Sequence, residues 1–234
     1  MRLIHVVTLT AGVVLWASCS GDTGSLFLAP GLDAGASGVP GTTIDADMPG
    51  AIDSDGSAYP SANIGGRPKS ATQAGQIFPN LTFPGVLSAA TADTQAVVSM
   101  SDYYDPQGLR YDLLHVIAIF MWCPHCNNET YNLATIAGWQ SSQRVAVIQI
   151  AMQGYNNATG ASPTWSDLQK WATDHNIAFP VLMDGQGAQL SAYFPVSAVP
   201  VNIVVNPRTM EVLAVDVGEV DDNQAYEQGF LSGL

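Results

Sequence analysis

Two cysteines separated by two residues form the part of this sequence best suited to chemistry. Cys123 and Cys126 stand in the stretch WCPHC, directly after the apolar run Leu113–Phe120. A run of this kind, rich in β-branched residues, predicts a strand that is buried on both faces. Pro124 suits the first turn of a helix, where its missing N–H is not needed. The sequence therefore places Cys123 where a buried strand ends and a helix begins.

This position favours thiol–disulfide exchange at the pair. Unpaired backbone N–H groups and the positive end of the helix dipole stabilise a thiolate over a thiol. We therefore predict that Cys123 is the nucleophile. Cys126, one helical turn further on, is predicted to attack the mixed disulfide and release the product. His125, when protonated or donating a hydrogen bond, would stabilise the Cys123 thiolate further.

Two other interpretations of the pair have less support. A bridge between Cys123 and Cys126 closes a very short loop, and the stabilisation that a disulfide gives grows with loop length. A structural zinc ion takes four ligands, and His115 and His175 are predicted to lie in a core strand and at a helix end. A structural disulfide and a metal site therefore stay as alternatives to redox chemistry, and no metal ligand is predicted.

The apolar patterns around the pair predict a mixed α/β sheet. Strands are expected at 81–86, 95–105, 113–120, 144–152, 179–183, 201–206 and 210–218, and helices from Pro124 to about Ser142 and over 164–176, 188–194 and 221–234. Thr164 or Ser166 is expected to cap the second helix. The strand–helix–strand order around the cysteines implies a parallel crossover unit.

The first 19 residues resemble an export signal. Arg2 is followed by the apolar run Leu3–Trp16 and by the small residues Ala17 and Ser18 before Cys19. The run is short for a membrane span of about 20 residues. The ending LWASC resembles a bacterial lipobox, which implies that Cys19 is lipidated. Plain cleaved secretion and a retained anchor remain alternatives.

The rest of the chain divides into a linker and a domain. Residues 20–75 are rich in Gly, Ala, Ser, Asp and Pro and bury too little apolar surface to fold, so they predict a disordered tether. Residues 76–234 hold the predicted domain. The formal net charge of −13 argues against nucleic acid as a partner, because binding it requires clustered cations. Lipidation of Cys19 implies that the domain is extracytoplasmic and that the lipid anchors it to the membrane.

A second motif, SAVPVNIVVNPRTMEVL, leads to a family resemblance. Together with WCPHC, the chain resembles the thioredoxin fold, with an N-terminal β-hairpin extension and a helix insertion. Within that fold it resembles the TlpA/ResA-type redoxins, which are membrane-tethered thiol:disulfide oxidoreductases. The resemblance implies that Pro200 is cis and packs against the cysteines, and that the backbone of Val199 pairs with a substrate strand. It further implies that Trp122 shapes the substrate rim and that Glu129 helps to move the Cys126 proton. Glu129 as a solvated helix-face acid is the alternative.

Three positions depart from related patterns. Thioredoxins carry a buried Asp, and DsbA-like oxidases a Glu, where this chain has Ile117, so the usual buried base is missing. Tyr131 stands nearest to the place of a proline in the active-site helix. The dipeptide Pro124–His125 is the DsbA signature, although the 73 residues between Cys126 and Pro200 leave no room for the helical domain of DsbA.

These observations predict an enzyme, a protein dithiol–disulfide oxidoreductase. It would use no cofactor beyond the Cys123–Cys126 disulfide, and its partners would be protein thiols and disulfides together with a redox partner protein. A peroxiredoxin-like peroxidase is one alternative, although Phe120 stands where such enzymes usually carry Thr. A non-enzymatic copper-binding module that uses the two cysteines and His125 is another.

Overall fold

The structure is a computed structural model that describes residues 56–62, 74–156, 160–194 and 196–234. The predicted signal peptide, Cys19 and most of the predicted linker lie outside these ranges. No helix within the described ranges is long and apolar enough to cross a membrane.

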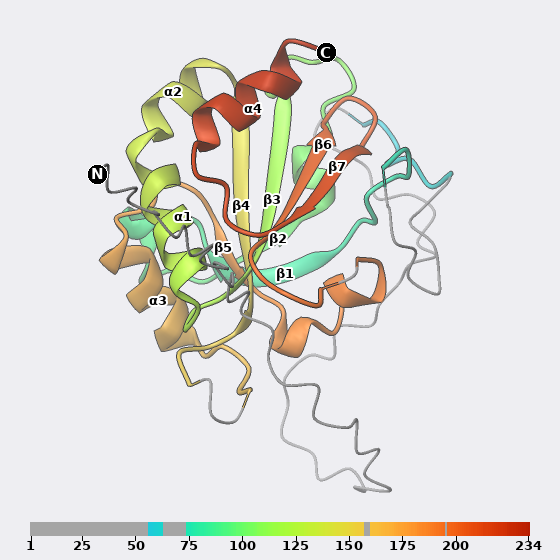
Figure 1. The fold of residues 1–234 in the computed structure, drawn as a ribbon. Coiled ribbons are helices and arrows are strands. Elements are labelled where there is room, and N and C mark those ends of the chain that lie inside the picture. Colours follow the sequence, from blue (N-terminus) through green and yellow to red (C-terminus); the bar gives the residue numbers. More distant parts are fainter. Residues whose placement is uncertain (1–55, 63–73, 157–159, 195) are drawn as a thin grey trace, which may run out of the picture.

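Seven strands form one mixed sheet in the order β2-β1-β5-β4-β3-β6-β7 (Figure 1). The central strands β3, β4 and β5 run parallel, and β1, β6 and β7 pair with their neighbours in the antiparallel sense. This confirms the predicted parallel crossover from the strand before the cysteines to the next strand. The strand bounds are β1 Thr82–Val86, β2 Ala96–Ser99, β3 Leu113–Phe120, β4 Val145–Gln153, β5 Val181–Met183, β6 Val201–Asn206 and β7 Glu211–Val217.

Four α-helices accompany the sheet: α1 Pro124–Thr135, α2 Ala137–Ser142, α3 Trp165–Asp174 and α4 Asn223–Leu231. Within the described residues, 3₁₀ helices lie at Ala89–Thr91, Met100–Tyr103, Gly185–Gly187 and Leu190–Ala192. At the start of α3, the Thr164 side chain accepts a hydrogen bond from the backbone of Asp167, so the predicted cap at Thr164 is confirmed.

Three predicted elements differ from the structure. The short helix expected over 188–194 is a 3₁₀ helix, Leu190–Ala192. The single helix expected from Pro124 to about Ser142 is broken at Ile136, whose ψ of 8° is not helical. The β-branched Ile136 and the nearby Gly138 have low helix propensities, which weakens this turn. The expected strand 95–105 ends at Ser99, where a capping box between Ser99 and Asp102 starts a 3₁₀ helix instead.

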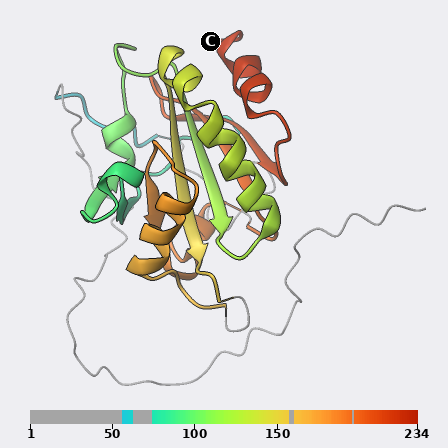
Figure 2. The same ribbon diagram turned by 90° about the vertical axis from the view of Figure 1, so that its left-hand side faces the viewer.

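Strand β3 separates two hydrophobic clusters because its side chains alternate between the faces of the sheet. Leu113, Ile117 and Ile119 face the cluster under α1, α3 and α4, whereas Leu114 and Val116 face the cluster under the N-terminal segments and the 3₁₀ helix Leu190–Ala192. Figure 2 shows α1, α3 and α4 over the same face of the sheet. The cysteine pair belongs to this helix-covered cluster.

Part of the predicted linker packs against the domain. Tyr59 is buried in the second cluster, and its hydroxyl donates a hydrogen bond to the carbonyl of Phe78 at 2.6 Å. The packed structure therefore includes residues on the N-terminal side of position 76.

Candidate active site

The two cysteines lie at the N-terminus of α1, directly beyond the end of β3. Cys123 is the N-cap residue of α1 and Pro124 is its first residue. Both cysteines are buried, and they are not joined by a disulfide. The Cys123 thiol donates to the carbonyl oxygen of Val199 at 3.8 Å, and the Val199–Pro200 peptide is cis. The structure therefore brings together the two motifs that the sequence holds 73 residues apart.

The environment of Cys126 suits a thiol that stays protonated until it is needed. Burial is the main cause that raises its pKa well above the ordinary value, and the neighbouring Cys123 sulfur adds to the shift. The charge of Glu129 acts in the same direction. A thiol of this kind reacts only when a nearby group accepts its proton.

Glu129 is fully buried, three residues after Cys126 on α1. This rules out the alternative that it is a solvated acid on the helix face. Neither of its carboxylate oxygens makes a hydrogen bond of good geometry with a described residue. Burial raises the pKa of Glu129 to about 8, and the negative charge of Glu219 adds to this shift, while polar contact with the Asn202 side chain and the Val220 backbone opposes it. A carboxyl poised near neutral pH beside a buried thiol can accept its proton.

His125 has a partner that the sequence did not predict. Its Nδ1 atom lies 2.6 Å from Oε2 of Glu219, in the connection between β7 and α4. The His125 side chain is 42% exposed and that of Glu219 is 18% exposed, so solvent reaches this ion pair. Any positive charge that a protonated His125 offers to Cys123 is therefore partly balanced by a carboxylate.

Two polar side chains, Trp122 and Asn127, hold the rim and the start of α1. The Trp122 indole N–H donates to Oε1 of Gln153 at 2.9 Å, which fixes the half-buried ring beside the pair. The Asn127 amide donates to the carbonyl oxygens of Met121 and Cys123 at 3.2 and 2.9 Å. These bonds restrain the turn that carries the nucleophile.

A second polar network fastens α1 to the sheet. The hydroxyl of Thr130 donates to the carbonyl of Cys126, and the Gln149 amide donates to that hydroxyl at 2.7 Å. The Trp171 indole donates to the Gln149 oxygen. All three side chains are buried and uncharged, so this network positions the helix without changing the charge of the site.

Ile117, at the position of the missing buried base, is fully buried in the helix-covered cluster and offers no proton acceptor. Among the described residues, no group of three His, Cys, Asp or Glu side chains could hold a metal ion.

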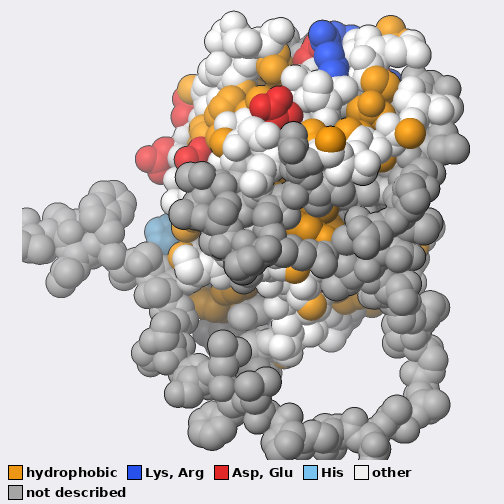
Figure 3. Space-filling view, turned by 90° about the vertical axis from the view of Figure 1, so that its right-hand side faces the viewer, with side chains coloured by type: hydrophobic (Ala, Val, Ile, Leu, Met, Phe, Trp, Pro, Cys, Tyr) orange, Lys and Arg blue, Asp and Glu red, His pale blue; other side chains and the backbone are white. Residues whose placement is uncertain are grey.

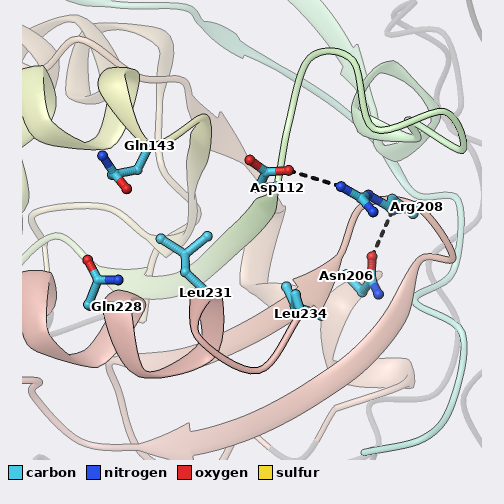
Figure 4. A pocket seen from close by; sticks show the side chains of 7 residues that line it. All are labelled: Asp112, Gln143, Asn206, Arg208, Gln228, Leu231 and Leu234. Atoms are coloured by element: carbon cyan, nitrogen blue, oxygen red, sulfur yellow. Dashed lines mark hydrogen bonds and ion pairs between the residues drawn. The ribbon is translucent and has the colours of Figure 1, made fainter.

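A surface cavity of about 350 Å³ lies at the other end of the sheet (Figure 4). Its walls include Asp112, just before β3, and Asn206, at the end of β6, whereas the cysteines and Pro200 adjoin the opposite ends of these two strands. At the rim of this cavity, a guanidinium nitrogen of Arg208 lies 3.3 Å from a carboxylate oxygen of Asp112, so these two charges are paired. None of the predicted site residues lines this cavity.

The surface near the β6–β7 side of the molecule carries charges of both signs. Figure 3 shows cationic side chains near the top of this face, acidic side chains to the left, and hydrophobic side chains scattered between them. The described residues visible on this face therefore form no broad cationic area.

A buried dithiol motif at the start of a helix, beside a cis proline in a seven-stranded mixed sheet, defines a thioredoxin-fold protein of the redoxin type. The model of the AhpC/TSA family matches residues 74–215, and the chain belongs to this family. This confirms the predicted fold and the redoxin resemblance.

Solved structures agree on the fold. A Chlorobium tepidum protein assigned as the thiol:disulfide interchange protein DsbE is 19% identical, with 68% of this chain and 96% of that chain covered and a TM-score of 0.51. The AhpC of Enterococcus faecalis is 14% identical, with 69% and 91% covered and the same TM-score. No curated protein matches the chain. At these identities the solved structures show only the fold, so the activity must be argued from the site.

Sequence reasoning identified the residues on the two motifs but missed those that surround Glu129. Asn202 lies on β6, Glu219 in the loop before α4, and Glu227 on α4. Asn202 is a polar residue within the apolar run VNIVVN, and His115 interrupts LLHVIAIF in the same way. A polar side chain inside a strand buried on both faces needs a hydrogen-bond partner. This signal could have pointed to the buried polar residues near Glu129.

Proposed function

We propose that this protein is a membrane-tethered, extracytoplasmic thiol:disulfide oxidoreductase of the TlpA/ResA type. It would exchange disulfides with protein substrates through Cys123 and Cys126. The observation that carries the proposal is the arrangement of a buried dithiol at the start of α1, with Glu129 one turn further on. Apocytochrome c or another protein with a disulfide to be reduced is the expected kind of substrate.

The reaction is written here in the direction of substrate reduction. The Cys123 thiolate attacks one sulfur of the substrate disulfide, so a mixed disulfide forms and the first substrate thiolate leaves. The Glu129 carboxylate takes the proton of Cys126, and the new thiolate attacks the Cys123 sulfur. The Cys123–Cys126 bond forms and the second substrate thiolate leaves. Two electrons pass to the substrate, whose thiolates take up protons.

The substrate would lie against Val199 and Trp122. In a mixed disulfide the Cys123 thiol proton is gone, so the nearby Val199 carbonyl is available to accept a hydrogen bond from a substrate backbone N–H. The Trp122 ring, held by Gln153, forms the neighbouring rim. Backbone pairing of this kind tolerates many substrate sequences, because the specificity for side chains is left to the rim.

The direction of electron flow depends on the reduction potential of the pair. A more stable thiolate at Cys123 makes a stronger oxidant, and dithiol proteins range from about −270 mV for thioredoxin to about −120 mV for DsbA. His125 favours the oxidising end, whereas the negative charge of Glu219 beside it acts in the opposite sense. We propose a potential between these limits, with reduction as the physiological direction.

Turnover of a protein disulfide tests the function. The reduced protein should reduce insulin disulfides with a dithiol donor, Cys123→Ser should abolish turnover, and Cys126→Ser should accumulate a mixed disulfide on Cys123. Absence of turnover in the wild-type protein, with both thiols shown to be reactive, would overturn the proposal. A potential at or above that of DsbA would reverse the proposed direction.

A peroxidase is the second candidate, since the family match and the AhpC structure share this fold. In that reaction the Cys123 thiolate attacks a peroxide oxygen and becomes a sulfenic acid, releasing water or an alcohol. Cys126 then displaces water to form the disulfide. Faster turnover of hydrogen peroxide than of insulin would favour this candidate.

Tight stoichiometric binding of Cu(I), with no turnover of insulin or of peroxide, would favour the copper-binding module.

The membrane tether is a separate part of the proposal and rests on the sequence around Cys19. Cells that express the full chain should incorporate labelled palmitate into it and retain it in the membrane fraction. Cys19→Ser should remove both the label and the membrane retention. Equal labelling of the two proteins would overturn the lipid anchor without affecting the redox proposal.

A further inference from the structure

His175 lies at the C-terminal end of α3 and is buried between α3 and α1. Its ring packs against the Trp171 ring, with centroids 4.2 Å apart, and against the Tyr131 ring of α1, with centroids 4.4 Å apart. The proposed exchange reaction makes no use of this histidine. Because the ring is buried, both of its nitrogens need hydrogen-bond partners within the protein.

Both ring nitrogens of His175 face oxygen atoms. Nδ1 lies 2.9 Å from the carbonyl oxygen of Trp171, and Nε2 lies 3.2 Å from Oδ1 of Asn127 on α1. The Asn127 oxygen is identified because the amide nitrogen of the same side chain donates to two carbonyls. A carbonyl or amide oxygen can only accept, so both hydrogen bonds exist together only when each ring nitrogen carries a proton and the ring is positive.

The neutral His175 ring leaves one of these two contacts unmade. With its single proton on Nδ1 it presents a lone pair to Asn127, and with the proton on Nε2 it presents one to the Trp171 carbonyl. The hydrogen bonds therefore favour the charged ring, whereas burial favours the neutral ring and lowers the pKa of His175. Protonation of His175 thus changes the number of hydrogen bonds that hold Asn127.

Charged and titratable groups reach the surroundings of His175 from three segments: Tyr131 on α1, Tyr155 after β4, and Lys170 and Asp174 on α3. The charge of Asp174 acts to raise the pKa of His175 and that of Lys170 acts to lower it, and these two side chains pair with each other. Tyr155 packs against Trp171. Among the contacts of His175, the one with Asn127 leads to the cysteine motif.

Asn127 connects His175 to the nucleophile. Its amide nitrogen donates to the carbonyl oxygens of Met121 and Cys123 at 3.2 and 2.9 Å. These carbonyls belong to the turn between β3 and α1, on which Cys123 presents its thiol to Val199. An amide whose oxygen accepts a hydrogen bond from a charged ring is polarised, so its N–H groups donate more strongly. The turn is therefore held more firmly when His175 is protonated.

We propose that His175 is a positioning residue for the attack by Cys123. In its protonated form it orients the Asn127 amide, which holds the turn that presents Cys123, and loss of the proton weakens this hold. The reactivity of each Cys123 thiolate should therefore fall as pH rises through the His175 titration. The inference rests on the proposed function for its catalytic meaning, but the contacts can be tested without any protein substrate.

The first test follows two NMR signals of the reduced protein as pH changes. His175→Gln identifies the ring signals of His175. Cys123 precedes the one Cys–Pro bond of the sequence, so cysteine labelled with ¹³C at the carbonyl and proline labelled with ¹⁵N give the Cys123 carbonyl a signal of its own. In wild type this signal should shift with the same midpoint as His175. In His175→Gln that inflection should be absent.

Variants of Asn127 test the contact itself. In Asn127→Leu the charged ring loses an acceptor, so the His175 midpoint should move to lower pH by about half a unit or more. In Asn127→Asp a carboxylate replaces the amide, so the midpoint should move to higher pH by about one unit or more. Asn128→Asp is the matched control, because it makes the same change of charge at the next, exposed position of α1. Its midpoint should stay within about 0.3 units of wild type.

The second test measures how fast Cys123 forms a mixed disulfide with hydroxyethyl disulfide, a small uncharged probe. The Cys126→Ser background keeps the mixed disulfide from being resolved, and the ultraviolet absorbance of the thiolate gives the ionised fraction of Cys123. Divided by that fraction, the rate should fall about two- to tenfold as His175 loses its proton, which is the effect of one hydrogen bond. His175→Gln and Asn127→Leu should lack this fall.

The outcomes separate the two proposals. A midpoint shared by His175 and the Cys123 carbonyl, the fall in rate, and shifts of opposite sign in Asn127→Leu and Asn127→Asp support the positioning role. A His175 ring that stays neutral down to about pH 4 overturns it. So does a carbonyl signal or a rate per thiolate that does not follow the His175 titration, or an equal shift in Asn127→Asp and Asn128→Asp.

The two aspartate variants decide if Asn127→Leu does not fold. If the signals and the rate behave as expected while wild type exchanges no protein disulfide, the inference about His175 stands and the proposed function fails.

Discussion

The imidazole of His125 lies 2.6 Å from the carboxylate of Glu219, a residue 94 positions further along the chain. One member of this pair stands between the two cysteines, and the other lies in the loop that leads into α4. The histidine of the redox motif therefore faces a carboxylate that the motif itself does not show.

The two charges should move the reduction potential of the cysteine pair in opposite directions. His125→Ala removes a cation that stabilises the Cys123 thiolate, so the pair should become more reducing. Glu219→Gln removes an anion, so the pair should become more oxidising. Because solvent reaches both side chains, we expect shifts of about 10 to 30 mV, measured against glutathione.

Glu211→Gln, at the far end of β7, is the control for the change in net charge. Shifts of the same sign in His125→Ala and Glu219→Gln would show that the pair acts through geometry and not through charge.

The buried carboxyl of Glu129 should make folding stability depend on pH. Its pKa is about 8 in the folded protein, against an ordinary value of 4.5. Between these pH values the folded state binds more protons than the unfolded state, so the free energy of unfolding falls as pH rises. Glu129→Gln lacks this dependence. Its stability relative to wild type should therefore grow by about 2 to 4 kcal/mol from pH 5 to pH 8.

Urea denaturation of both reduced proteins at several pH values measures this difference. Parallel curves of stability against pH would contradict the buried, raised-pKa state of Glu129.

Glu129→Gln should also slow the step in which Cys126 resolves the mixed disulfide. The amide cannot accept a proton, and a positioned general base contributes roughly 100-fold or more to such a step. The wild-type rate should rise with pH as Glu129 ionises, up to about pH 8, and the variant should lack this rise. Stopped-flow measurement of product release from a preformed mixed disulfide isolates the step. An unchanged rate would assign the proton transfer to another group.

The cap at Thr164 should contribute measurably to the stability of α3. Its hydroxyl accepts from the Asp167 N–H, and the Asp167 carboxylate accepts from the Thr164 N–H at 2.8 Å. Thr164→Ala should lower the free energy of unfolding by about 1 kcal/mol. Ser141→Ala, on the exposed side of α2, should change it little, and equal losses in the two variants would argue against the capping role.

Features that depend on neighbouring residues could be predicted from the sequence. A local pattern is sufficient to identify β3, the start of α1 and the cap of α3, because the signals act over a few positions. They are the continuous, β-branched apolar run Leu113–Phe120, the proline after Cys123 and the hydroxyl of Thr164. The break at Ile136 was missed because the helical pattern on its two sides reads as continuous.

The sequence by itself determined the redoxin fold, the dithiol and its place at the start of a helix. Only the tertiary structure decided what surrounds Glu129, because the partners there are 87 to 112 positions apart, as in His115 with Asn202 and with Glu227. No periodicity links such residues. They meet because β3 pairs with β6 and α4 packs over β3. Burial at that junction raises the pKa of Glu129 to about 8.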